Sequence, residues 1–245
     1  MRKQQNKNRS VREREEARQI RRMLIIGGGC FVSAAAVGVG STFLDPSFPV
    51  LSGEGSINDR LSEAGLDRHV LNLTPKRFAK SIVVIGTTDC TYCKAFVENG
   101  LDGLIAYAES DGLGLTYAPI GTTAGSLAST RLLGGFSHAP AAPAEILKTA
   151  YAAALDLGRG QLMDDVAHKY GGTLGLTPED VDAILAEPET AIASRIQSTM
   201  RAFPVQGTPM FFVANDQNPE RISMFSGWSG LSSLRGQIEA ARAHE

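Results

Sequence analysis

The stretch from residue 81 to residue 93 constrains the fold more than any other part of the chain. It reads Ser-Ile-Val-Val-Ile-Gly-Thr-Thr-Asp-Cys-Thr-Tyr-Cys. The continuous apolar run at 82–85 is rich in β-branched residues, which predicts a strand buried on both faces. Small and polar residues end the run, and residues 94–98 read as the start of a helix. The sequence therefore predicts a strand, a short turn and a helix, with a C-x-x-C pair where the helix begins.

The position of these two cysteines predicts a reactive dithiol. The free N–H groups and the positive dipole end of a helix favour a thiolate over a thiol, and Cys90 lies closest to that end. Cys93 follows about one helical turn later, near enough to close a disulfide with Cys90. The pair is therefore our candidate catalytic centre.

Half of a zinc site and a purely structural disulfide are the alternatives for this pair. The only other cysteine, Cys30, lies far upstream in an apolar segment, and the four histidines show no paired spacing. Zinc sites use closely spaced ligand pairs, so we expect no metal here. The position at a helix start argues against a static disulfide. We expect no cofactor beyond a redox-active Cys90–Cys93 disulfide.

A second feature lies about 116 residues after Cys93, at Gly207-Thr208-Pro209, followed by the apolar run 210–213. A proline entering a strand costs a ladder hydrogen bond and needs a reason. The segment resembles the Gly-Thr-Pro loop of the thioredoxin superfamily. That resemblance implies a cis peptide bond before Pro209 that faces the C-x-x-C. It also implies that Gly207, Thr208 and Pro209 bind the substrate chain.

The order of the other predicted elements indicates an α/β protein. An apolar run at 115–121 reads as a second strand, so that 81–121 forms a strand–helix–strand unit with parallel strands. Residues 125–203 are mainly helical, with a clear helix start at Thr177-Pro178. Strands at 210–213 and 222–225 and a closing helix at 231–243 complete the chain.

Over residues 78–243 this order resembles the DsbA/DsbC/DsbG group of periplasmic thiol–disulfide oxidoreductases. The resemblance implies a thioredoxin-like domain over 78–245 with a helical insertion at about 125–203. It implies that Cys90 is the exposed nucleophile and Cys93 the more buried resolving thiol, with Thr91 and Tyr92 tuning the Cys90 thiolate. We expect a Cys90 pKa below the free value of ~8.5 but above the extreme of about 3.5.

The resemblance leaves the direction of electron flow open. Tyr92 before the second cysteine, and the absence of a histidine between the cysteines, favour an isomerase or reductase slightly over an oxidase. Two other functions are considered. One is a thioredoxin-fold binding protein or chaperone with a static disulfide. The other is a dedicated periplasmic reductant, for example in cytochrome c maturation.

The N-terminal part of the sequence predicts export. Residues 1–22 carry a net charge of +6 and read as a cytoplasmic head, which leaves −8 for the rest and argues against nucleic-acid binding by the folded part. Residues 23–44 contain no charged residue and are about long enough to cross a bilayer of roughly 30 Å. This segment is either a transmembrane signal anchor or a cleaved signal of the Sec or twin-arginine type.

Export sets the predicted location and partners. Residues 45–77 read as a linker and short lead-in, with the following domain in the periplasm, anchored to the inner membrane through 23–44. Outside the cytosol a C-x-x-C can hold or donate a disulfide. The expected partners are cysteine-containing envelope or secreted proteins and a membrane redox protein that recycles the dithiol.

Overall fold

The protein is described by a computed structural model that covers residues 49–51, 55–66, 69–75, 80–121 and 123–243. The predicted head (1–22) and apolar segment (23–44) lie outside these residues. Across the described ranges, no helix combines the length and the apolar character that a membrane span requires.

The described part of the chain builds one mixed sheet of five strands in the order β1-β3-β2-β4-β5. The strands are β1 (Leu71–Asn72), β2 (Ser81–Gly86), β3 (Gly114–Pro119), β4 (Met210–Ala214) and β5 (Ile222–Ser226). The central strand β2 pairs in parallel with β3 and antiparallel with β4. The predicted strand–helix–strand unit is therefore confirmed, and β2 leads its turn out of the middle of the sheet.

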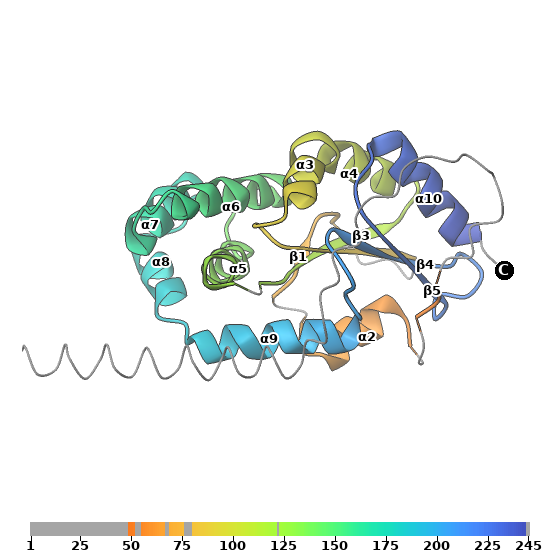
Figure 1. Ribbon diagram of the computed structural model, residues 1–245, viewed down its shortest axis with the longest axis horizontal. Coiled ribbons are helices and arrows are strands. Elements are labelled where there is room, and N and C mark those ends of the chain that lie inside the picture. Colours follow the sequence, from red (N-terminus) through yellow and green to blue (C-terminus); the bar gives the residue numbers. More distant parts are fainter. Residues whose placement is uncertain (1–48, 52–54, 67–68, 76–79, 122, 244–245) are drawn as a thin grey trace, which may run out of the picture. The chain divides into compact units, whose positions relative to one another are not determined.

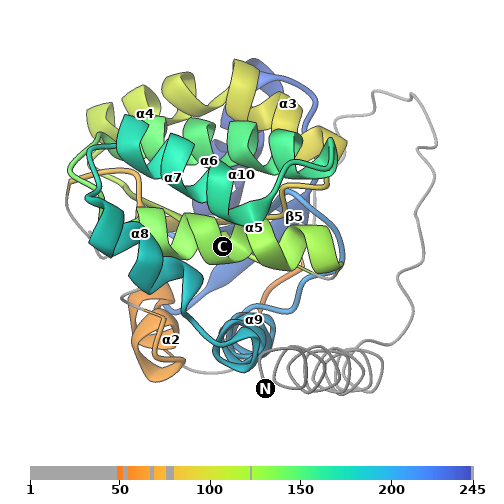
Figure 2. The same cartoon turned by 90° about the vertical axis from the view of Figure 1, so that its left-hand side faces the viewer.

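Nine helices accompany the sheet in the described residues. They are α2 (Ile57–Glu63), α3 (Thr91–Asn99), α4 (Leu101–Ser110), α5 (Ala124–Phe136), α6 (Pro143–Gly158), α7 (Met163–Thr173), α8 (Pro178–Leu185), α9 (Glu189–Ala202) and α10 (Leu231–Ala243). Helices α3, α4 and α10 cover one face of the sheet, and α2 and α9 cover the other (Figure 1). Helices α5 to α8 pack together as one group (Figure 2).

The apolar run of β2 divides between two cores, as expected for a strand buried on both faces. Ile82 and Val84 join the core beneath α3, α4, α10 and the helical insertion. Val83 and Ile85 join the second core, beneath α2 and α9. All four side chains are at most 1% exposed. The residues that follow β2 therefore start from a rigid support.

Two features of the fold differ from the sequence expectation. The helix after the cysteines ends at Asn99, and a second helix begins at Leu101. The Trp228 ring packs against Gly100 between them, where a Cβ would lie 2.1 Å from the ring. Part of the predicted linker packs on the domain, where the Leu51 N–H donates to the Ile222 carbonyl at 2.8 Å. A composition rich in Pro, Gly and Ser does not reveal such long-range pairing.

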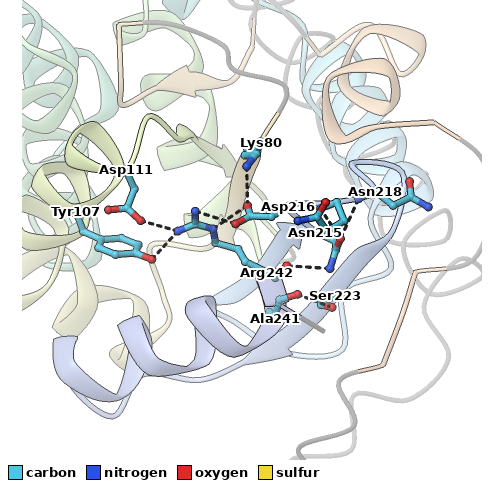
Figure 3. Close-up of polar contacts among 10 residues, drawn as sticks. Lys80, Tyr107, Asp111, Asn215, Asp216, Asn218, Ser223, Ala241 and Arg242 are labelled. Carbon is cyan, nitrogen blue, oxygen red and sulfur yellow. Dashed lines mark hydrogen bonds and ion pairs between the residues drawn. The ribbon is translucent and has the colours of Figure 1, made fainter. Parts of the chain in front are cut away.

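Arg242 near the end of α10 joins three separate parts of the described fold (Figure 3). Its guanidinium contacts Asp111 after α4 at 2.7 Å and the Tyr107 hydroxyl at 2.9 Å. It also makes two 3.1 Å hydrogen bonds to Asp216 in the β4–β5 turn. A bidentate arginine–carboxylate pair is geometrically specific, so this contact fixes α10 on the sheet.

Candidate active site

Cys90 is the N-cap residue of α3. Its backbone is extended, with φ −91° and ψ 119°, and its sulfur accepts a hydrogen bond from the Cys93 N–H at 3.2 Å. Sulfur thus takes the place of the oxygen that usually caps a helix. The pKa of the Cys90 thiol is lowered to about 6, mainly by hydrogen bonding to Cys93, which outweighs the opposite effect of burial. Smaller contributions in the same direction come from the Thr208 side chain and from the Cys93 and Tyr92 N–H groups. A thiolate is therefore favoured at neutral pH.

Cys93 sits on the buried side of the same helix and is fully enclosed. Burial raises the pKa of its thiol far above the ordinary value, while a hydrogen bond from the Thr87 backbone acts in the opposite direction. Both cysteines are free thiols in this structure. The two sulfurs thus differ in access and in acidity, although only two residues separate them.

The Thr208–Pro209 segment enters β4 in front of the cysteines. The Thr208–Pro209 peptide bond is cis. The Cys90 thiol donates a hydrogen bond to the Thr208 carbonyl at 3.1 Å. Gly207 precedes this contact and is partly exposed, whereas Pro209 is buried. The fold therefore brings the two predicted motifs together.

Hydroxyl groups of α5 hold the turn that carries Cys90. Asp89 accepts hydrogen bonds from the Thr87 hydroxyl and, at 3.0 Å, from the Thr123 hydroxyl. The Thr88 and Ser129 hydroxyls form a further contact. Thr123 lies 34 residues after Asp89 in the chain, so no local sequence pattern indicates this contact.

The two residues predicted to tune Cys90, Thr91 and Tyr92, follow it at the start of α3. Thr91 and Tyr92 form the first turn of α3, and the Tyr92 side chain is 59% exposed. A hydrogen bond from the Tyr92 backbone lowers the Cys90 pKa, whereas the tyrosine side chain is exposed to solvent. Cys90 itself is only partly exposed, less open than the sequence predicted.

Sequence analysis also missed two tyrosines behind the dithiol. Tyr117 of β3 and Tyr151 of α6 join their hydroxyls at 2.8 Å, and Tyr151 reaches the Thr87 carbonyl at 3.2 Å. The one available signal was a polar hydroxyl inside the apolar run 115–121, since buried tyrosines usually find a partner.

Comparison with known proteins gives structural matches only. No protein-family model and no curated protein sequence matches the chain. The structure is similar to alpha-DsbA1 of Wolbachia pipientis, at 12% identity over 71% of this chain and 90% of that chain, with a TM-score of 0.56. It is similar to BcfH of Salmonella enterica Typhimurium, at 16% identity over 76% and 79%, with a TM-score of 0.54.

A third match is the catalytic domain of ScsC from Proteus mirabilis, at 13% identity over 76% of this chain and 98% of that domain, with a TM-score of 0.51. The chain has a DsbA-type thioredoxin fold. The expected fold class, a thioredoxin fold with a helical insertion, is thereby confirmed. A DsbA-type fold does not by itself assign an activity, because function depends on the residues at the site.

Proposed function

We propose that this chain is a thiol–disulfide oxidoreductase that acts on cysteine-containing envelope or secreted proteins. The proposal depends on one observation, which is that the two thiols differ in solvent access and in pKa. Cys90 is accessible and has a pKa lowered to about 6, whereas Cys93 is enclosed and has a raised pKa. An accessible thiolate attacks or leaves readily, and an enclosed thiol is available only to its neighbour.

The reaction proceeds through a mixed disulfide. In the reducing direction, the Cys90 thiolate attacks a substrate disulfide, forms a Cys90–substrate S–S bond and releases one substrate thiolate, which takes up a proton. Cys93 then attacks the Cys90 sulfur, and the bond to substrate breaks. The second substrate sulfur leaves with the electron pair and the proton that Cys93 gave up. The dithiol ends oxidised and the substrate reduced.

In the oxidising direction the same steps run backwards. A substrate thiolate attacks the Cys90 sulfur of the Cys90–Cys93 disulfide, and Cys93 leaves. A second substrate thiol then displaces Cys90, which is a good leaving group because its pKa is low. We assign Gly207, Thr208 and Pro209 to the backbone that holds the substrate chain. The contact of the Thr208 carbonyl with the Cys90 sulfur supports this assignment.

Export and recycling belong to the same proposal. The charge-free segment 23–44 behind a basic head supports an inner-membrane anchor or a cleaved signal, with residues 45–245 in the periplasm. A membrane redox protein would restore the dithiol or the disulfide after each turnover. Isomerase activity and service to a single client are variants of this proposal.

The test is the reduction potential of the Cys90–Cys93 pair, measured in the full-length chain by equilibration with glutathione. Cys30→Ser keeps the third cysteine out of the measurement. We expect a value between about −120 mV, as in strong oxidants, and about −270 mV, as in thioredoxin. A value at the lower end would favour the dedicated reductant. A disulfide that glutathione does not open would reject the enzyme and leave a binding protein with a static bridge.

Cysteine variants provide an independent test of the proposed exchange activity. Cys93→Ser should accumulate mixed disulfides with substrate proteins, because the resolving thiol is missing. Cys90→Ser should form none and should lose all exchange activity. A binding protein would keep its partner in both variants.

A further inference from the structure

The buried tyrosine pair behind the dithiol has no part in the exchange steps above. Tyr117 and Tyr151 are 1% and 8% exposed, and their hydroxyls are 2.8 Å apart. The Tyr117 hydroxyl lies against the end of β2, where a Cβ on Gly86 would be 2.2 Å from it. The glycine thus leaves the space that the phenol fills.

The hydrogen bonds of the pair run in one direction. The Tyr151 hydroxyl donates to the Thr87 carbonyl at 3.2 Å. With its proton committed there, Tyr151 accepts the proton of Tyr117, so the chain runs from Tyr117 through Tyr151 to Thr87. The Cys90 N–H donates to the same Thr87 carbonyl at 3.3 Å. The tyrosines therefore end on the residue that supports the Cys90 turn.

Thr87 also reaches the buried sulfur. Its backbone N–H forms a hydrogen bond with Cys93 that lowers the pKa of that thiol, against the larger effect of burial. Burial raises the pKa of both tyrosines, and a negative charge on Cys93 raises it further, for Tyr151 after the effect of Tyr117. Thr87 is thus held by Tyr151 through its carbonyl and contacts Cys93 through its N–H.

We propose that Tyr151, supported by Tyr117, is a positioning residue for the resolving step of thiol–disulfide exchange. Its hydroxyl holds Thr87, and through Thr87 the Cys93 sulfur, in the place from which Cys93 attacks Cys90. The reverse step uses the same geometry, because Cys93 then leaves from that position. This inference rests on the proposed function, since it concerns the second half of the same reaction.

The experiment isolates the resolving step. The reduced full-length chain carrying Cys30→Ser is converted to a mixed disulfide of Cys90 with glutathione, and the release of glutathione by Cys93 is followed in time. Tyr151→Phe should slow release by roughly tenfold, the kinetic equivalent of one lost hydrogen bond. The alkylation rate of Cys90 should stay unchanged, because the Cys93 N–H still caps its sulfur.

Tyr170→Phe is the matched control. Tyr170 also lies in the helical insertion, and its hydroxyl donates to Asp156 at 2.8 Å, so the substitution removes a hydroxyl that does not contact Thr87. It should leave glutathione release at the wild-type rate. Equal release in the Tyr151→Phe and Tyr170→Phe variants would overturn the inference.

A double variant separates positioning from stability. Tyr151→Phe leaves the buried Tyr117 hydroxyl without its acceptor, which lowers stability. Adding Tyr117→Phe removes that hydroxyl, so the double variant should recover thermal stability and still release glutathione slowly. Recovery of the release rate together with stability would show a purely structural role and overturn the inference. A wild-type chain that neither forms nor resolves the mixed disulfide would instead reject the proposed function.

Discussion

The Cys90 sulfur lies 3.1 Å from the Thr208 carbonyl oxygen, although 118 residues separate them in the chain. Cys90 follows β2 and Thr208 precedes β4, and these two strands are antiparallel neighbours in the centre of the sheet. The contact therefore follows from strand pairing. It places the backbone just before β4 beside the partly exposed sulfur, where a substrate chain must approach.

The thiolate of Cys90 should form near pH 6. Hydrogen bonding to Cys93 is the main cause of its lowered pKa, so the rate of alkylation by iodoacetamide should rise with a midpoint at about pH 6. Cys90→Ser should abolish this phase. A midpoint at the value of a free thiol would contradict the capping role of the sulfur.

Replacing Thr208 should raise the pKa of Cys90. The Thr208 side chain forms a hydrogen bond that lowers the Cys90 pKa, after the larger effect of Cys93. Thr208→Val removes that bond with little change in shape, so the alkylation midpoint should move to higher pH. Thr173→Val is a control, because among the described residues the Thr173 hydroxyl bonds to the Lys169 carbonyl within α7, at 3.0 Å. Equal midpoints in both variants would exclude the hydroxyl from thiolate stabilisation.

The reduced protein should become more stable as pH rises above about 6. The folded-state pKa of Cys90 is lowered below its unfolded value. Between these two pKa values the unfolded state binds more protons than the folded state, so the free energy of unfolding increases with pH. The gain is lost as pH falls through about 6. Cys93 acts only at higher pH, because its pKa is raised.

Urea unfolding of the reduced chain across this pH range measures the effect. The oxidised chain has neither thiol and serves as the control, together with Cys90→Ser. If the reduced and oxidised chains showed the same pH dependence, the lowered pKa of Cys90 would be ruled out.

Gly86→Ala should destabilise the fold by roughly 1–3 kcal/mol, the usual cost of overpacking a core. The added methyl would lie 2.2 Å from the Tyr117 hydroxyl and 2.9 Å from its ring, and Tyr117 is enclosed. Gly172→Ala in α7 is the control, since its Cβ would meet nothing within 4 Å. A helix gains slightly from that change. Chemical denaturation of both variants makes the comparison.

Arg242→Met should cost roughly 2–4 kcal/mol of unfolding free energy, because it breaks a partly buried ion-pair network. The Arg242 side chain is 13% exposed and its partners Asp111 and Asp216 are 37% and 28% exposed. Arg201→Met on α9 is the control, since Arg201 is exposed and, within the described part of the chain, its side chain bonds to the Gln197 carbonyl of its own helix at 3.4 Å. Equal losses in the two variants would show that the network of Figure 3 contributes little.

Local patterns predicted most of the secondary structure. The β-branched run before Gly86 predicted a strand, and Thr177-Pro178 predicted a helix that begins with a capping threonine. Both are observed. Such signals act over a few residues, so they can be read in order along the chain. The packing of Trp228 against Gly100 was not predicted, because Trp228 comes from a distant part of the sequence.

Local sequence patterns were enough to predict the two cysteines at a helix start, the proline before β4 and the strand–helix order of this fold. The difference between the two thiols, and the residues that support them, became visible only in the folded chain. The pKa of Cys93 depends on burial, and the place of Thr87 depends on Tyr151 from a distant helix. Burial and hydrogen-bond partners arise from segments that meet only after folding, so no local pattern encodes them.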